Sequence, residues 1–159
     1  MQSKNVNFGH LQKFSPKGRI VPFPLPFGIT KDDGTFAPAV LHLRFAGDGN
    51  PGWLNAITAH AAANPTRLRG IATQGNREVA QLLEARDRAL FPKHVVVGWD
   101  NVVDSEGQRV PFSVEACSDF FEALPLWILD DVRLFALTAS NFVASNIPTP
   151  EQAEELAGN

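Results

Sequence analysis

Residues 19–45 read RIVPFPLPFGITKDDGTFAPAVLHLRF and indicate a β-hairpin. In the second half of this stretch the residues of the two faces alternate: Leu41, Leu43 and Phe45 share one face, and Val40, His42 and Arg44 share the other. Successive side chains of a strand point to opposite faces, so this period of two is typical of a half-buried strand. The letters KDDG are typical of a turn. We therefore predict that 19–27 pairs with 38–45.

Proline occupies every second position in the first half of the hairpin, at Pro22, Pro24 and Pro26. Proline has no N–H to donate to a sheet, so the segment is either an edge strand or a polyproline-like extension. Both alternatives leave it on the surface. Pro22, Phe23, Pro24 and Pro26 are therefore a candidate strip for binding a partner.

Helical patterns follow residue 50 and supply the support that a lone hairpin needs in water. Asn50 and Pro51 suit the N-cap and first position of one helix. Residues 64–75 are expected to be a loop before a second helix, and Ser113 is a cap for a third.

The second helix is expected from near Asn76. Its charged residues, Asp87 among them, are expected to face solvent, and Glu84 can pair with Arg88 four residues later. Pro92 is expected to end or kink this helix. Residues 93–99 are apolar and short, so their strand propensity and their helical neighbours leave both structures open.

The last helix, from Trp127 to Ala139, is apolar nearly all round apart from Asp130, Asp131 and Arg133. A helix of this kind is usually central in a core or an interface. The two aspartates are adjacent and point about 100° apart on a helix, so they do not face each other as an acid–base pair would.

These elements predict an α+β fold: a mainly helical C-terminal bundle with an N-terminal arm and a β-hairpin. Residues 1–18 are polar with isolated apolar residues and form the arm. Residues 19–145 form a single domain, with the hairpin at 19–45 and the helical part at 50–145. Residues 146–159 are rich in proline and glutamate and are expected to be a mobile tail.

Composition excludes several classes of protein. The chain has 159 residues, a net charge of −3 and 14 scattered basic residues, so we expect no nucleic-acid binding. No apolar stretch approaches the ~20 residues of a membrane span, and the N-terminus is unlike a secretory signal. The single cysteine cannot form an internal disulfide. A cytoplasmic protein, or a particle built in the cytoplasm, is expected.

We find no catalytic, cofactor-binding or metal-binding constellation in the sequence. Cys117 lies on the predicted buried face of its helix and is interpreted as a core residue. The four histidines are far apart and lack the spacing of metal ligands. We therefore expect a protein that is not an enzyme, needs no cofactor or metal, and acts by binding or assembly.

Residues 88–142 resemble the tail assembly chaperones of tailed bacteriophages and related small phage tail-morphogenesis proteins. A helix leads to a Gly-Trp pair, a turn and a capped amphipathic helix follow, and a last helix closes the region. The matching motifs are Gly98-Trp99, Asp104 to Gly107, Val110-Pro111-Phe112-Ser113, Leu124-Pro125 and Asn141-Phe142.

The resemblance implies a small helical protein that coats the tape-measure protein and recruits tail-tube subunits in the cytoplasm of the infected bacterial host. Its partners would be these tail proteins, with possible self-association and with no nucleic acid or membrane. Trp127, Leu134 and Phe135 would line the groove that binds the partner.

The first fifty residues depart from that family pattern, because a minimal helical chaperone needs neither an arm nor a proline-rich hairpin. Arms and hairpins are common where the subunits of a shell or tube interlock. The alternative is a structural component of the virion, in tail or head, that contacts neighbouring subunits through its arm and hairpin.

Trp99 and Phe112 flank the turn at 104–107. Two aromatic rings on either side of a turn can pack on each other, so we predict a structural clasp in which both side chains are buried.

Overall fold

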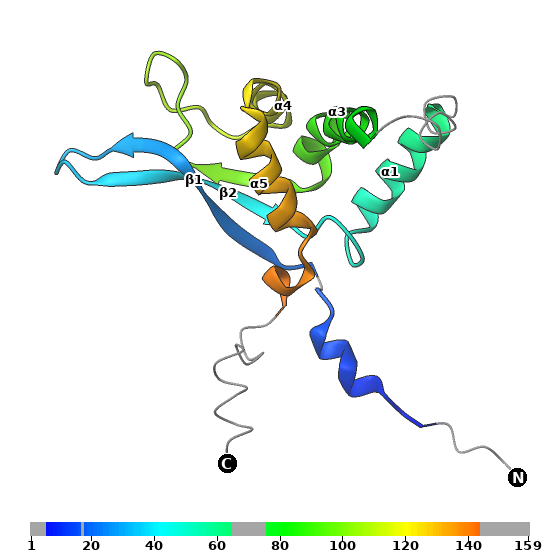
Figure 1. Ribbon diagram of the computed structural model, residues 1–159. Coiled ribbons are helices and arrows are strands. Elements are labelled where there is room, and N and C mark those ends of the chain that lie inside the picture. The colour runs from blue at the N-terminus through cyan, green and yellow to red at the C-terminus, as the bar shows by residue number, and fades with distance from the viewer. Residues whose placement is uncertain (1–5, 17, 65–75, 144–159) are drawn as a thin grey trace, which may run out of the picture.

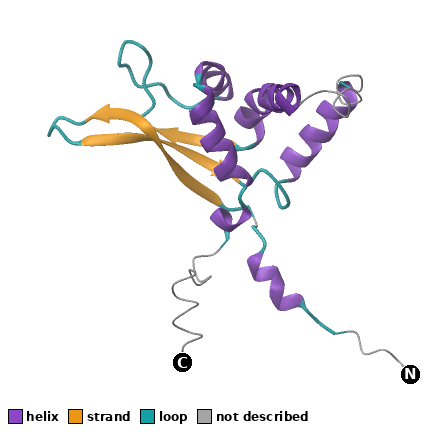
Figure 2. Ribbon diagram, in the orientation of Figure 1, coloured by secondary structure: helices purple, strands orange, loops and turns teal. Residues whose placement is uncertain are grey.

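The computed structural model describes residues 6–16, 18–64 and 76–143. It confirms the α+β fold: a three-stranded antiparallel sheet in the order β1-β2-β3 is packed against helices (Figures 1 and 2). The elements are η1 Gly9–Phe14, β1 Ile20–Thr30, β2 Phe36–Arg44, α1 Pro51–Ala63, α3 Asn76–His94, β3 Val96–Asp100, α4 Val114–Ala123, α5 Leu126–Leu137 and η2 Ala139–Phe142.

The predicted hairpin is confirmed, and its strands are longer than expected. The pairing runs from Ile20 opposite Arg44 to Thr30 opposite Phe36. At the turn, the Lys31 N–H donates to the Thr35 carbonyl at 2.8 Å. Leu41 and Leu43 are fully buried, as the alternation predicted.

An irregularity interrupts β1 between Pro24 and Gly28, where the pairing with β2 shifts. A Cβ atom on Gly28 would lie 2.1 Å from the Ala37 carbonyl oxygen. Only a residue without a side chain allows the two backbones to approach so closely. Gly28 therefore permits the long hairpin to continue past the bulge.

The structure resolves the two alternatives for residues 93–99. Helix α3 continues through the buried Pro92, which we expected to end or kink it, as far as His94. Strand β3 then begins at Val96 and pairs with β2, so the strand propensity of the valines prevails. The central strand β2 is thereby paired on both sides.

Asn50 caps α1, as predicted, and also joins distant parts of the chain. Its Oδ1 accepts a hydrogen bond from the Trp53 N–H at 3.2 Å. Its Nδ2 donates to the Phe45 carbonyl at 3.0 Å and to the His94 carbonyl at 2.9 Å. One side chain thus fixes the end of β2, the start of α1 and the end of α3 relative to one another.

One core cluster lies between the sheet and the helices. Its centre is aromatic. The Phe91 ring packs edge-on against Trp53, with ring centroids 5.2 Å apart, and its centroid lies 6.1 Å from that of Phe121. Every large side chain here is withdrawn from water, which is the main stabilising contribution in a domain of this size. The fully buried members include Ala39, Leu41, Leu43, Phe91, Val95, Cys117, Phe121, Leu129, Val132 and Ala136.

The arm contains the short 3-10 helix η1 and extends away from the helices (Figure 1). Its side chains from Val6 to Phe14 are exposed. The expected loop at 64–75 lies outside the described residues from position 65 onward, and so does the expected tail at 146–159.

Candidate interaction surface

The rings of Trp99 and Phe112 lie against each other with centroids 5.2 Å apart and planes at 90°. The indole N–H of Trp99 also donates to the Val110 carbonyl at 2.8 Å. Both side chains are half-buried and pack against the core, so they are less buried than expected. Because the turn at 104–107 projects into solvent between them, the contact fastens this loop to β3 without enclosing it.

The proline strip is divided between the two faces of β1. Pro22, Pro24 and Pro26 are exposed. Phe23 points the other way and packs on Phe135 of α5, with ring centroids 4.9 Å apart. Phe23 and Phe135 therefore support each other inside the molecule, and the prolines remain as the exposed part of the strip.

The prolines also determine what the free edge of β1 offers to another chain. Pro22 lies opposite His42 and Pro24 opposite Val40, but neither proline can donate a hydrogen bond to β2. In an antiparallel pair the hydrogen-bonded positions alternate, so the intervening Phe23 supplies the donor. At the proline positions the outward edge of β1 then carries carbonyls and no N–H, which disfavours the addition of a further strand.

Helix α5 has one buried face and one exposed apolar face. Ile128, Leu129, Val132 and Ala136 are buried in the core. On the other side, Leu134 is 69% and Trp127 60% exposed. We call this surface the α5 outer face; its apolar members are Leu126, Trp127, Leu134 and Leu137, all exposed.

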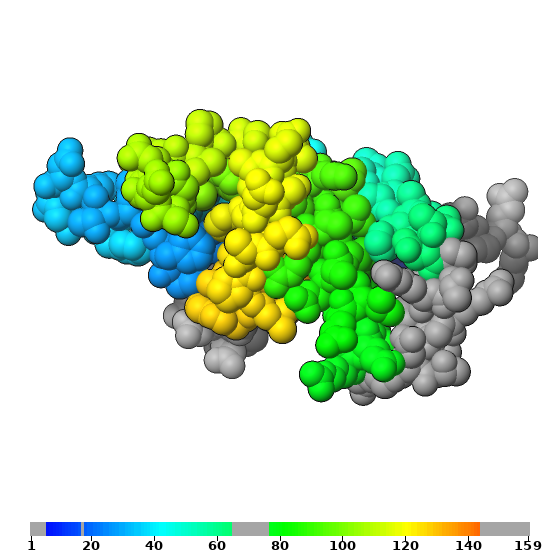
Figure 3. All heavy atoms as spheres, turned by 90° about the horizontal axis from the view of Figure 1, so that it is seen from above, coloured from blue at the N-terminus to red at the C-terminus, as the bar shows by residue number. Residues whose placement is uncertain are grey.

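Asp130 and Asp131 are also exposed on α5 and lie among these apolar residues. Asp130 accepts a hydrogen bond from Arg133 Nη1 at 3.1 Å. At about 100° per residue, all six side chains fall within a sector of roughly 140°. The outer face therefore combines apolar area with negative charge. Figure 3 shows α4 and α5 at the surface, between the loop that precedes α4 and helix α3.

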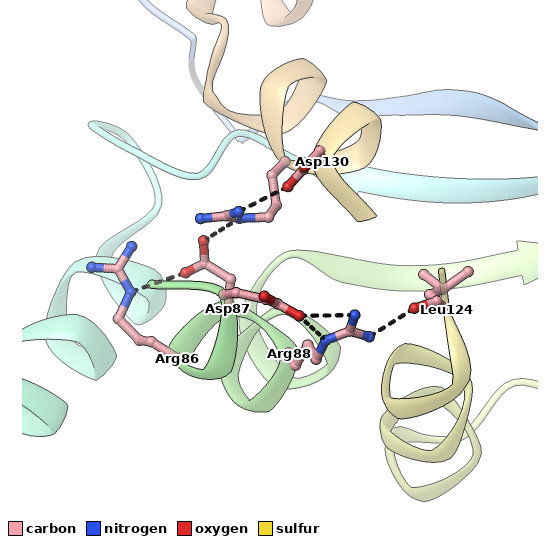
Figure 4. A network of polar contacts seen from close by, with 7 residues as sticks. Arg86, Asp87, Arg88, Leu124 and Asp130 are labelled. Atoms are coloured by element: carbon pink, nitrogen blue, oxygen red, sulfur yellow. Dashed lines mark hydrogen bonds and ion pairs between the residues drawn. The ribbon is translucent and has the colours of Figure 1, made fainter. Parts of the chain in front are cut away.

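A buried ion-pair network holds α5 against α3 (Figure 4). Asp87 is 1% exposed and was wrongly expected to be solvated. Its carboxylate accepts from Arg86 Nε at 2.9 Å and from Arg133 Nε at 2.7 Å. A buried carboxylate needs such partners because an unpaired charge is costly to remove from water. The sequence offers no signal for this burial, since Asp87 lies in a run of charged residues.

Arg88 extends the same network to α4. It forms the predicted pair with Glu84 at 3.1 Å, and it donates to the Leu124 carbonyl at 3.0 Å and to the Phe121 carbonyl. These carbonyls lack intrahelical partners because they lie at the end of α4. Arg88 therefore caps the end of α4 from helix α3. Together with the ion pairs of Asp87, its contacts fix the positions of α3, α4 and α5, and so of the α5 outer face.

The described residues contain no group of His, Cys, Asp and Glu side chains that could hold a metal ion. Cys117 is fully buried, and burial raises the pKa of its thiol to about 12. A thiol with this pKa is protonated at neutral pH, as expected for a core residue. Within the described ranges, no helix is long and apolar enough to cross a membrane.

A protein-family model described as YdaY prophage protein matches residues 55–159. The match includes α3, α4, α5 and the loop with Trp99 and Phe112, and it begins after the arm and the hairpin. No curated protein and no solved structure matches the chain.

Proposed function

Because the chain belongs to the family of YdaY prophage proteins, and is thus phage-derived, we propose that it is a non-enzymatic protein of phage assembly. Specifically, it acts as a tail assembly chaperone that binds the tape-measure protein and tail subunits. The family description indicates phage origin; the tail role goes beyond it and rests on the surface of the molecule.

The α5 outer face carries this proposal. Large apolar side chains scattered singly are ordinary on a protein surface, but a contiguous apolar group on one helix marks an interaction site. Trp127 and Leu134 together expose an aromatic and an aliphatic side chain of the kind that anchors a partner. The natural ligand of such a surface is an amphipathic helix, which lays its own apolar side chains against it.

The rest of the molecule makes this surface rigid. The opposite face of α5 is packed in the core, and Arg133 binds Asp87 of α3 at 2.7 Å. A preorganised surface loses less conformational entropy on binding, so a modest apolar area can capture a client segment. This suits a chaperone that must hold many equivalent segments of a long tape-measure protein and release them later.

The test is co-expression of the full chain with the tape-measure protein of the same phage. Wild type should keep the tape-measure protein soluble and co-purify with it. The double variant Trp127→Ser/Leu134→Ser should lose the complex, because both anchors are removed. The matched control, Leu54→Ser/Val114→Ser, replaces exposed apolar residues of α1 and α4 and should retain it. Equal capture by all three proteins would exclude the α5 outer face.

A structural component of the virion is the second candidate, favoured by the exposed arm and by the exposed prolines of β1. Mass spectrometry of purified particles beside a lysate of infected or induced cells separates the two candidates. Presence in particles at fixed copy number supports the structural component. Abundance in the lysate and absence from particles supports the chaperone, which leaves before the tail is complete.

A further inference from the structure

The arm displays an apolar stripe that its own molecule leaves uncovered. Phe8, Leu11 and Phe14 recur every three residues around η1, and they are 61%, 49% and 43% exposed. A 3-10 helix has three residues per turn, so side chains three apart lie above one another on one side. A short helix without a packed face is marginal in water, so this stripe needs a partner surface.

The arm is also the basic end of an acidic chain. All 17 acidic residues lie beyond residue 31, whereas the arm, residues 1–18, contains three of the 14 basic residues. Lys13 places one of these charges in η1, beside the apolar stripe. A surface suited to the arm would therefore be apolar and negatively charged.

The α5 outer face has this combination. Its four apolar side chains are exposed, and Asp130 and Asp131 lie among them. Asp130 already binds Arg133, while Asp131 makes no ion pair within the described part of the chain. Asp131 is thus the carboxylate best placed to receive a lysine from another chain.

We propose that the arm of one copy docks on the α5 outer face of a second copy. The arm leads away from the helices of its own molecule (Figure 1), so the contact joins two molecules. This inference rests on the proposed function in one respect: the same outer face binds the client. The docked arm then keeps the outer face covered until a client segment displaces it.

The contact joins two different surfaces, so it is not self-complementary. Two copies can exchange arms and close a pair, or each arm can reach the next copy and build an open chain. In both arrangements a molecule needs an intact arm to donate and an intact outer face to accept. This asymmetry allows a complementation test.

The test uses two full-length variants, each broken in one half of the contact. The arm variant is Phe8→Ser/Leu11→Ser, and the face variant is Trp127→Ser/Leu134→Ser. All four side chains are exposed, so both variants should keep the wild-type circular dichroism and melting temperature. Leu54→Ser/Val114→Ser, which replaces apolar residues elsewhere that are 37% and 41% exposed, is again the matched control.

Sedimentation equilibrium measures the outcome. Wild type and control should self-associate with concentration. Each variant alone should associate at least about tenfold more weakly, because truncating a buried leucine or aromatic side chain loses more than one factor of ten in affinity. An equimolar mixture of the two variants should form heterodimers, since the intact arm of one meets the intact outer face of the other.

Reversing the charges of Lys13 and Asp131 tests whether these two residues meet in the contact. Lys13→Glu and Asp131→Lys should each weaken the association, and the double variant should restore it in part. Acrylamide quenching of Trp127, the exposed tryptophan, should fall as the wild type associates. Wild type that stays monomeric up to its solubility limit, or a variant mixture that stays monomeric, would overturn the inference. Client capture by the arm variant is measured separately, so failure of self-association leaves the proposed function intact.

Discussion

Helix α5 belongs to two regions of opposite character. On its inner side, the junction of α3, α4 and α5 buries its apolar side chains and pairs every charge that it encloses, with Asp87 held between Arg86 and Arg133. On its outer side, the same helix exposes Trp127 and Leu134 next to unburied aspartates. The arm resembles the outer side, because its apolar residues are also exposed.

The inner side of α5 serves folding, whereas the outer side is the part that we propose to bind a partner. The buried apolar side chains and paired charges at the junction contribute to stability. Substituting these residues should destabilise the fold without a specific effect on binding. Exposed apolar side chains contribute little to folding, so those on α5 and in the arm are where we expect a partner to bind. Substitutions on the two sides of one helix should therefore have opposite consequences.

The largest effect is expected at the centre of the junction. Phe121→Ala should lower the free energy of unfolding by about 4 kcal/mol, because a fully buried phenylalanine leaves a cavity next to Phe91 and Phe120. Leu134→Ala, on the outer side, should change it by less than about 0.5 kcal/mol. Urea denaturation followed by circular dichroism measures both, and equal losses would erase the distinction between the two regions.

Asp87→Asn should cost about 3 kcal/mol, since it leaves two arginines without their shared carboxylate. The matched control is Asp130→Asn, which removes an exposed partner of Arg133 and should cost well under about 1 kcal/mol. Chemical denaturation of both variants decides the point. A small loss for Asp87→Asn would mean that the network aligns α5 without stabilising it.

Gly28→Ala should lower stability by about 2 kcal/mol, because the new Cβ collides with the Ala37 carbonyl and one strand must shift. Gly107→Ala tests the other extreme: its φ of 80° is strained for alanine, but nothing lies near the new Cβ. Denaturation curves compare the two. If both cost the same, backbone conformation and not the close approach of β1 and β2 would explain the requirement at Gly28.

Replacing Pro22, Pro24 and Pro26 together by serine should lower stability less than Phe121→Ala, Asp87→Asn or Gly28→Ala. Each exchange should cost about 0.5 kcal/mol, through the greater freedom of the unfolded chain. The new N–H groups complete a free strand edge, so the variant should aggregate with a rise in β-structure. Light scattering and thioflavin fluorescence detect this. A triple variant that stays as soluble as wild type would remove the protective role of the prolines.

Local chemistry made much of the fold predictable. The alternation around Leu41 and Leu43 indicated β2, and the caps at Asn50 and Ser113 placed the starts of α1 and α4, because these signals act over a few residues. Strand β3 remained open, since a short apolar run is compatible with both structures. Its pairing with β2 decides the outcome, and that contact joins residues about sixty positions apart.

The candidate site was predictable in part. Trp127 and Leu134 were selected as interface residues and are exposed on α5, whereas Phe135 and Phe23 contact each other inside the molecule. Helical spacing alone does not tell which side of an almost uniformly apolar helix faces the core. Burial of Asp87 was missed for a related reason: its partner Arg133 lies 46 residues away.

The hydrogen bonds of Asn50 have a consequence for local opening. Its amide group is held by carbonyls of Phe45 and His94, from segments that meet only in the folded chain. The first turn of a helix usually frays and exchanges its amide hydrogens quickly. Here the Trp53 amide, bound to Asn50 Oδ1, is tied to both segments. Its hydrogen exchange should therefore report global unfolding, although it lies at the very start of a helix.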